Sequence, residues 1–413
     1  FLITGAASYA VPNNRMNNAG TNSTTGVSHE GIVVWGLGSR AHVGGAVVLG
    51  AGAEAKGSGE DSSIAVGRKA VADGTNAQAI GVNAKANGAK SLAIGSDSVA
   101  QTAGDIAIGG GANAVAAAAG IPAVTSKGVA IGNNAKAEGS ISIGELSSSN
   151  HFGVAIGYNA GAQNTTTGSS FANVTIGANT RVGVQGGTQA AQGIAIGSGI
   201  QANEGAWAKG DQSIAIGANT IASGDSSVVI GGDDLDRVAA SNATYTKKTF
   251  DKNGNQTGTT TVTKNLNQLF GDLTGRGAIL NANTTIDGVQ YSRWKGTEAE
   301  QGAVALGVKA VSGDIALAIG TMSEARGINS VAIGTGAQTP QANAVAIGGG
   351  STTNGIQGRQ ITDADIALSD GTTMTFTNFA GAANVEEGSM VSFGRLGKER
   401  QLKNIAPGEV SAT

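Results

Sequence analysis

Short apolar phrases that end in glycine recur along most of the chain. Ile214-Ala215-Ile216-Gly217, for example, returns 14 residues later as Val228-Val229-Ile230-Gly231. The phrase occurs 18 times between Gly36 and Gly394, most often at a spacing of 14 residues. Because apolar side chains alternate at every second position and many are β-branched, the pattern predicts strands and not helices. A repeat this short predicts an all-β solenoid in which each repeat forms one coil.

A second, weaker run follows each phrase, as in Asn83-Ala84-Lys85-Ala86-Asn87-Gly88. Each coil should therefore contain two short strands joined by two tight corners. Glycine adopts the positive φ that such corners require. The predicted corner glycines are Gly67, Gly81, Gly95, Gly109, Gly132, Gly157, Gly197, Gly217, Gly231, Gly320, Gly334 and Gly348.

Alternation places the bulky and the small members of each phrase on opposite faces of the strand. We expect the bulky members to fill the interior of the coil. They are Ile64, Val66, Leu92, Ile94, Ile106, Ile108, Ile131, Ile156, Ile196, Ile214, Ile216, Ile319, Ile333 and Ile347.

The alanine face is expected to be the contact between chains, because small side chains let another backbone come close. Its members are Ala65, Ala93, Ala107, Ala130, Ala155, Ala195, Ala215, Ala332 and Ala346. A thin coil of five-residue strands encloses too little apolar surface to be stable alone. The missing partner should be another copy of the same chain.

Composition narrows the class of protein further. The chain has 413 residues, of which 68 are glycine and only 4% are aromatic, so a conventional aromatic-rich core is excluded. The net charge of −3 implies no attraction to nucleic acid. The absence of cysteine excludes disulfides and thiolate metal sites. No stretch of 18 apolar residues predicts a membrane-spanning helix.

The longest gap between phrases, from Gly231 to Gly307, predicts an insertion. Residues 245–250 and 259–263 alternate around Asn253-Gly254, which is a strong hairpin signal. We expect a projecting β-hairpin, followed by a short helix near residues 265–270. The residues proposed to contact a ligand here are Tyr245, Phe250, Asn253, Gly254, Tyr291 and Trp294.

The phrases Ser91-Leu92-Ala93-Ile94-Gly95 and Ser330-Val331-Ala332-Ile333-Gly334 resemble the signature of a known family. It is that of the head domains of trimeric autotransporter adhesins, the YadA-like heads of Gram-negative bacteria. The resemblance implies a left-handed parallel β-roll and a parallel homotrimer. It also implies attachment to host matrix such as collagen or fibronectin, to cells, to other bacteria or to abiotic surfaces.

The C-terminal stretch from Glu399 to Gly408 resembles the neck of that family, where each chain crosses to its neighbour. The resemblance implies a stalk and an outer-membrane anchor in the full-length protein, outside this chain, and hence a place on the bacterial surface. The residues that carry it are Arg400, Gln401, Leu402, Asn404, Ile405 and Gly408.

These signals divide the chain into six segments. The division predicts an N-terminal cap (1–31), roll repeats (32–231), an insertion with a hairpin and short helix (232–303), further roll repeats (304–350), a second insertion (351–389), and a last coil with the neck (390–413).

No residue set predicts catalysis, a cofactor or a metal. His29, His42 and His151 lack metal-ligand spacing, and Asp233, Asp234 and Asp236 fit the capping of a short helix better than a calcium loop. An ice-binding solenoid would show Thr-x-Thr at the same position of each repeat, and a phage-tail depolymerase would show an acidic groove. The sequence has neither pattern. We therefore expect a multivalent adhesin that binds through outer strands and insertions, first through residues 244–263 and 351–388.

Overall fold

The computed structural model describes residues 16–17, 32–57, 62–115, 127–162, 172–183, 191–377 and 385–405. The chain forms two compact units, Phe1–Gly217 and Ala218–Thr413. Both are built from stacked coils with two strands each, so the predicted β-solenoid is confirmed.

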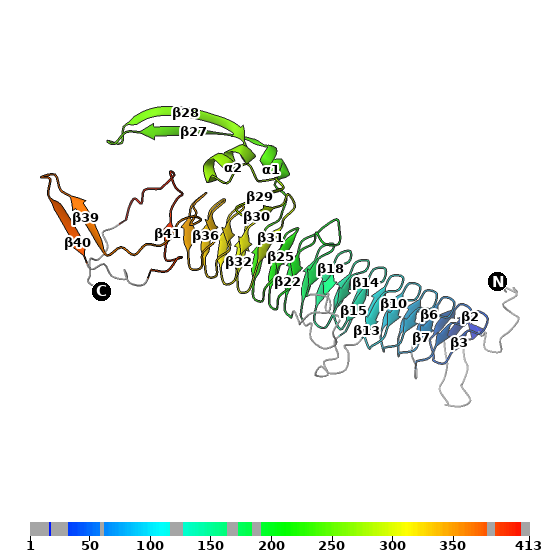
Figure 1. Ribbon diagram of the computed structural model, residues 1–413. Helices are drawn as coiled ribbons and strands as arrows, with labels where there is room; N and C mark the ends of the chain where they lie inside the picture. The colour runs from blue at the N-terminus through cyan, green and yellow to red at the C-terminus, as the bar shows by residue number, and fades with distance from the viewer. Residues whose placement is uncertain are drawn as a thin grey trace. The chain divides into compact units, whose positions relative to one another are not determined.

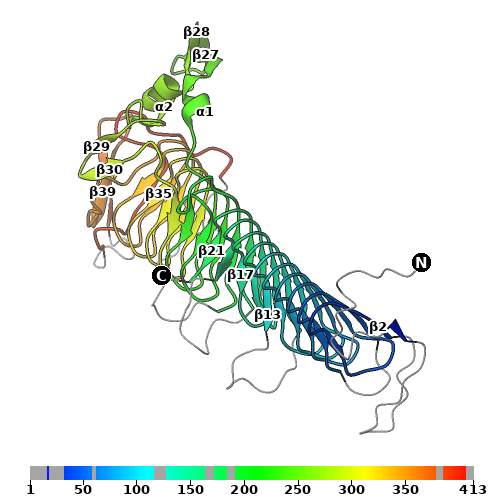
Figure 2. The same ribbon diagram turned by 90° about the vertical axis from the view of Figure 1, so that its right-hand side faces the viewer.

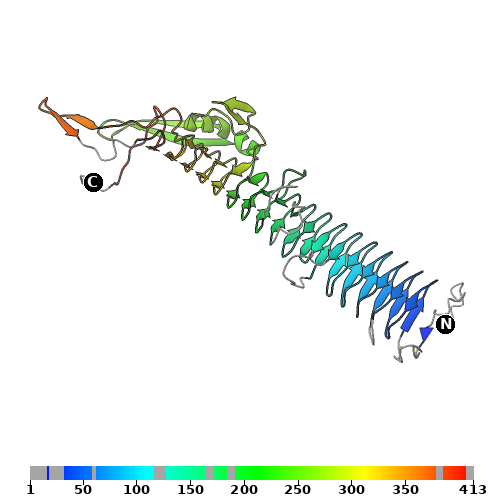
Figure 3. The same ribbon diagram turned by 60° about the horizontal axis from the view of Figure 1, so that its bottom comes forward.

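In the first unit, the glycine-ended phrases form a parallel sheet that we call the first sheet, and Figure 3 shows its strands stacked coil upon coil. Equivalent residues of successive coils pair with each other, as Leu92 with Ile106 and Ala93 with Ala107. A strand β1 (Met16–Asn17) pairs antiparallel with β2. The strands of the first sheet are β2 (Ile32–Trp35), β4 (Val47–Leu49), β6 (Ile64–Val66), β8 (Gln78–Ile80), β10 (Leu92–Ile94), β12 (Ile106–Ile108), β14 (Val129–Ile131), β16 (Ile141–Ile143), β18 (Val154–Ile156), β20 (Val174–Ile176), β22 (Ile194–Ile196) and β24 (Ile214–Ile216).

The weaker runs form the opposite wall of each coil, a second parallel sheet. Its strands in the first unit are β3 (Arg40–Ala41), β5 (Glu54–Ala55), β7 (Val71–Ala72), β9 (Lys85–Ala86), β11 (Val99–Ala100), β13 (Asn113–Val115), β15 (Lys136–Glu138), β17 (Ser148–Ser149), β19 (Gly161–Ala162), β21 (Arg181–Val182) and β23 (Trp207–Ala208).

The side chains inside the coils are the small ones, so the expected assignment of the two faces was wrong. The nine alanines expected at the contact between chains, Ala65, Ala93, Ala107, Ala130, Ala155, Ala195, Ala215, Ala332 and Ala346, are at most 1% exposed and lie inside their own coil. The bulky residues expected in the interior point outward and are half-buried or exposed: Ile64, Val66, Leu92, Ile94, Ile106, Ile108, Ile131, Ile156, Ile196, Ile214, Ile216, Ile319, Ile333 and Ile347.

The two sheets of a coil lie too close together for larger side chains. Among the fully buried side chains of the described residues, the largest are valines such as Val48 and Val182, followed by threonines. Many interior hydroxyls bond to the backbone of their own corner, as Ser98 Oγ does when it donates to the carbonyl of the corner glycine Gly95 at 2.8 Å. Close packing inside each coil therefore comes from small residues, and isoleucine is left to the outside.

Ten of the twelve predicted corner glycines have positive φ, and Gly81, with φ of 138°, is typical. A Cβ at Gly81 would also lie 2.5 Å from the carbonyl oxygen of Gly95 in the next coil. At the two exceptions, Gly197 and Gly231, only this close approach applies, because a Cβ would lie 2.5 and 2.4 Å from the oxygens of Gly217 and Gly307. Glycine is thus required by stacking as well as by backbone conformation.

The second unit repeats the coil, with β26 (Val228–Ile230), β32 (Val304–Leu306), β34 (Leu317–Ile319), β36 (Val331–Ile333), β38 (Val345–Ile347) and β41 (Val391–Ser392) in the first sheet. The second sheet contains β25 (Thr220–Ala222), β31 (Thr297–Ala299), β33 (Val311–Ser312), β35 (Glu324–Ala325) and β37 (Gln338–Thr339). Because β31 pairs with β25, the coil resumes at Thr297, inside the segment predicted as insertion.

The predicted hairpin and helix of the insertion are confirmed, on one side of the coils of this unit (Figures 1 and 2). The elements are α1 (Asp236–Ala240), β27 (Asn242–Phe250), β28 (Gln256–Asn265), α2 (Leu266–Thr274), β29 (Thr284–Ile286) and β30 (Val289–Tyr291). Asn265 caps α2, its side chain accepting the amide of Gln268. A smaller hairpin, β39 (Asp363–Ala367) and β40 (Thr373–Thr377), lies in the second insertion. None of the helices in the described parts of the chain is long and apolar enough to cross a membrane.

Enlarging one interior alanine tests the assignment of faces. We expect Ala93→Leu to lower the free energy of unfolding by about 1–3 kcal/mol, because the coil has no room for three more carbons. Lys85→Leu is the matched control, since Lys85 points outward and is exposed. Denaturant unfolding measures both. Equal stability of the two variants would mean that Ala93 does not face the interior.

Candidate functional site

The outward side chains of the first sheet form an aliphatic surface on each unit, which we call the aliphatic face. In the first unit most strands add two members, as Leu92 and Ile94 do in β10, whereas β8 adds Ile80 beside the polar Gln78. Exposed members include Ile141, at 41%, in the first unit and Ile230, at 44%, in the second. Isolated apolar residues are common on protein surfaces, but a continuous apolar stripe marks a place of association.

In the second unit, the insertion is attached to the coils by a buried arginine. Arg276 follows α2 and is 8% exposed. Its guanidinium forms an ion pair with Glu324 of β35 and donates to the Met322 carbonyl and, at 2.7 Å, to the Tyr291 hydroxyl. Arg326 approaches the other oxygen of Glu324 at 2.9 Å. One carboxylate on the outer side of the second sheet, covered by the insertion, thus holds a cation from the insertion.

A lysine from the coils makes the reverse attachment. The ammonium of Lys309 donates to three carbonyl oxygens of the insertion, those of Leu280, Ser292 and Arg293, at 3.0, 3.3 and 2.7 Å. Lys309 itself is 6% exposed. Burial lowers the pKa of Lys309 below its usual range, although Asp233 and Asp236 act in the opposite direction. Insertion and coils are therefore joined by two buried cations, one from each side.

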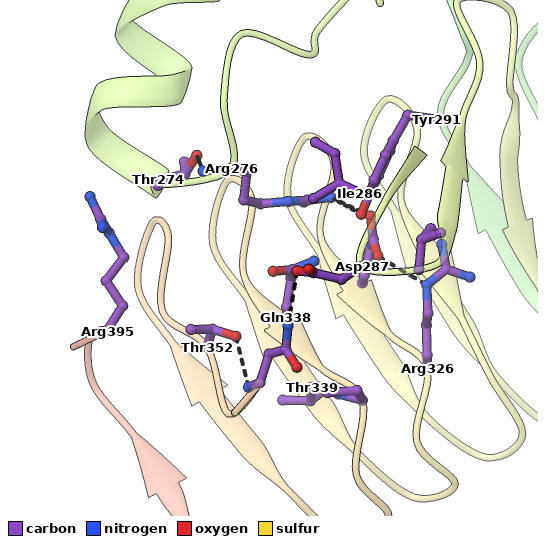
Figure 4. A pocket seen from close by; sticks show the side chains of 15 residues that line it. Thr274, Arg276, Ile286, Asp287, Tyr291, Arg326, Gln338, Thr339, Thr352 and Arg395 are labelled. Carbon is purple, nitrogen blue, oxygen red and sulfur yellow. Dashed lines mark hydrogen bonds and ion pairs between the residues drawn. The ribbon is translucent and has the colours of Figure 1, made fainter. Parts of the chain in front are cut away.

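Beside the Arg276 attachment the second unit has a cavity of about 250 Å³ (Figure 4). Ile286, Val289 and the ring of Tyr291 line it from the insertion. Asp287 stands at the tight turn between β29 and β30 and accepts a contact of 3.4 Å from the Asn354 side chain across the opening. The cavity joins an apolar wall to a wall of charged and amide side chains.

Electrostatics at the buried end of this cavity favour the ionised carboxylate. Burial alone would raise the pKa of Glu324, but Arg276 and Arg326 outweigh it and hold that pKa below its usual range. Burial raises the pKa of the Tyr291 hydroxyl, which therefore stays protonated. Glu324 and its two arginines thus carry a net positive charge at neutral pH.

The proposed ligand-contact residues separate into exposed and buried ones. Phe250 and Trp294 are 60% and 55% exposed, and Asn253 and Gly254 form the exposed turn of the hairpin. Tyr245 is half-buried at the base of the hairpin. Tyr291 is only 6% exposed and belongs to the apolar cluster under the insertion, where it lines the cavity and not the outer surface.

Comparison with protein families identifies the repeats. The model of the YadA head domain repeat matches residues 60–84, 74–98, 86–112, 127–144, 208–233, 312–337 and 325–351. The chain is a YadA-like head. The resemblance seen in the sequence is thereby confirmed for repeats in both units. No individual curated protein matches the chain.

The residues predicted to form a neck are described as far as Ile405, and Gly408 lies outside the described residues. Arg400 fixes the segment to the last coils, its guanidinium donating to Ser351 Oγ at 2.8 Å and to the carbonyls of Phe393 and Gly349. Gln401 and Asn404 are exposed, as are Leu402 (58%) and Ile405 (65%).

The histidines and acidic residues have ordinary structural surroundings. His42 lies 3.0 Å from Glu54 on the surface, His151 is buried, and His29 lies outside the described residues. Asp233 accepts from Asn219, Asp234 accepts the amide of Asp236 ahead of α1, and Asp236 pairs with Arg293. Asp234 precedes the N-cap residue Leu235, which makes no side-chain capping hydrogen bond, so the predicted capping of α1 is not seen and the run does not converge on one point.

Sequence reasoning missed Arg276, Lys309 and Glu324. Lys309 and Glu324 occupy ordinary repeat positions, and Arg276 follows a helix whose C-terminal glycine gives no hint of a buried neighbour. Their importance comes from contacts between distant segments, such as the 48-residue separation of Arg276 and Glu324. The equivalent strand position also holds a charged residue in other coils, such as Glu54, Lys85 and Glu298, so the charge of Glu324 did not distinguish it.

The Glu324 ion pair predicts a pH dependence. Because the folded pKa of Glu324 is below the ordinary value of 4.5, its contribution is present above that pH and is lost as the pH falls through the folded pKa. Glu324→Gln should cost about 3–5 kcal/mol at pH 7, since Arg276 then stays buried without a counter-ion. Thermal unfolding of both proteins measures the difference, which should shrink as the pH falls from about 5 to 3. A difference that is constant over this range contradicts the assignment.

Proposed function

We propose that this YadA-like head is the adhesive part of a bacterial surface protein and acts as a parallel homotrimer. The observation that carries the proposal is the aliphatic face, which a single chain leaves half-exposed coil after coil. Burying an isoleucine or leucine fully stabilises by about 1.5–3 kcal/mol. Three chains that turn these faces toward one another would bury two such residues per coil and per chain.

A contact between chains through the aliphatic face fits a trimer better than the contact through alanines that the sequence predicted. Alanines at a chain contact would bury little apolar area, whereas isoleucine and leucine bury much more. The interior of each coil is already filled by alanine, serine and threonine. The surface that remains for association is therefore the aliphatic one.

We propose that adhesion is multivalent and takes place on surfaces that point away from the chain contact. The hairpin β27–β28 exposes threonines on one face, where Thr244 and Thr263 lie opposite each other with their hydroxyl oxygens 2.8 Å apart. Its outer strand edges offer unpaired backbone groups to a partner. Three copies on one trimer would add weak contacts into firm attachment to matrix proteins, cells, other bacteria or abiotic surfaces. We propose no enzymatic activity for the head.

Charges placed on the aliphatic face test the trimer. Leu92→Asp combined with Ile106→Asp should convert the trimer to monomers, because each chain would bring two carboxylates into an apolar contact. Lys85→Asp changes the net charge by the same amount on the second sheet and should leave the trimer intact. Sedimentation velocity distinguishes these outcomes, and a trimeric double variant would contradict the proposed interface.

Removal of the hairpin tests the site of attachment. Ala243 pairs with Lys264, so residues 244–263 can be replaced by Asn-Gly, which closes a two-residue hairpin. We expect this variant to stay trimeric and to lose at least about tenfold in attachment to matrix-coated or uncoated surfaces, since three weak contacts are lost together. Attachment equal to that of the unaltered head would place adhesion on the coils instead.

A further inference from the structure

The cavity of the second unit has the character of a small ligand site. Its volume of about 250 Å³ lies near the lower end of ligand pockets, which suits one sugar ring better than a peptide. Residues from four segments meet there: Tyr291 and Asp287 from the insertion, Arg326 after β35, Gln338 in β37, and Asn354 in the second insertion.

The walls of the cavity are fixed in advance. Arg276 ties the insertion to Met322 and Glu324 of the coils, and Lys309 ties the coils to three carbonyl groups of the insertion. A site whose walls are already ordered does not lose conformational entropy when a ligand enters. Rigid walls are therefore available for a weak, specific ligand.

Several polar groups in the cavity can form further hydrogen bonds. Within the described residues, Arg326 bonds Glu324 through Nε only, which leaves its two terminal nitrogens to donate. The Gln338 carboxamide likewise makes no hydrogen bond to another described residue, and it is half-buried. Asp287 and Asn354 share a single long contact of 3.4 Å. Donors from Arg326 and Gln338 are therefore available to a ligand around the opening.

Charge selects among the possible ligands. Arg276 and Arg326 share one carboxylate, that of Glu324, so the inner end carries an excess positive charge. The opposite wall is apolar, with Ile286, Val289 and Pro340. A ligand that matches both walls has one carboxylate, several hydroxyl groups and an apolar ring face. That is the chemistry of an acidic monosaccharide.

We propose that this cavity binds an acidic monosaccharide, a uronic or sialic acid type of sugar at the end of a glycan chain. The carboxylate of the sugar accepts hydrogen bonds from the terminal nitrogens of Arg326. Gln338 and Asn354 bond its hydroxyl groups, and Ile286 and Val289 contact the ring. This inference rests on the proposed adhesive function in one respect only, since it names a class of target for the same head.

Calorimetric titration of the whole head with simple glycosides tests the proposal. The probes are the methyl glycosides of N-acetylneuraminic acid, of glucuronic acid and of glucose, together with acetate. We expect at least one acidic glycoside to bind with a Kd of about 1 mM or lower, and methyl glucoside and acetate to bind at least about tenfold more weakly. Equal binding of acidic and neutral glycosides, equal binding of acetate, or no binding at all overturns the proposal.

Two variants and one control locate the binding. Arg326→Gln removes the donors, and Asn354→Asp adds a negative charge at the opening without touching the Glu324 ion pair. Each should weaken binding of the acidic glycoside by about tenfold or more, with thermal unfolding showing that the fold is kept. Arg359→Gln, an exposed arginine outside the cavity lining, should bind like the unaltered head. Unchanged binding in both cavity variants would place the sugar elsewhere.

A glycan array and an attachment assay separate the two proposals. Binding of sialylated or uronic acid-terminated glycans, but not of the same chains without the acidic sugar, supports the terminal position. A head that attaches to surfaces but binds no acidic sugar refutes the sugar site and leaves adhesion standing. A head that binds the sugar but attaches to nothing refutes adhesion alone.

Discussion

The narrow interior of the coil is the constraint on which the rest of this head depends. Two sheets that belong to one short repeat lie so close that alanine, serine and threonine fill the space between them, with valine as the largest frequent member. Stacked corners leave no room for a Cβ, and glycine follows at the end of each phrase. Every bulky aliphatic residue is then forced to the outside by volume alone.

Because of that constraint, the large aliphatic side chains can contribute to stability through association and contribute little to the fold of a single chain. In most domains the largest aliphatic residues are buried within one chain, and association adds to a structure that is already stable. Here the interior of a coil is mainly methyl groups and hydroxyls, and isoleucines such as Ile94 and Ile333 stay half-buried. The free energy that those residues can supply is realised only when another surface covers them, so the arrangement favours obligate association.

The sequence alone was sufficient for everything that depends on period and on local turn chemistry. Fourteen-residue spacing, glycine corners, the Asn253-Gly254 turn and the helix that begins after Asn265 are all local signals, and the structure contains each of them. Period 2, however, defines two faces without saying which is inside. Larger side chains lie inside in wider sheet packings, but the small spacing within one coil places them outside.

Contacts between distant segments could not be predicted from the sequence, for a different reason. Arg276 and Glu324, or Lys309 and the carbonyl groups of the insertion, come together only after the chain has left the roll and returned. No pattern within 14 residues encodes such a meeting. The candidate sugar site is made of these contacts, and so it is invisible in the repeat that identifies the family.

The two buried cations also explain why the insertion adopts one position on the coils of its unit. Apolar contacts such as those of Phe270 and Met322 tolerate small slips, since one methyl group replaces another at little cost. A guanidinium with three fixed acceptors, or an ammonium among three carbonyl oxygens, has no alternative site nearby, and displacement would leave a buried charge without partners. Buried charge thus fixes the position of the insertion on the roll. Because that position is fixed, the cavity between the insertion and the roll keeps a defined shape.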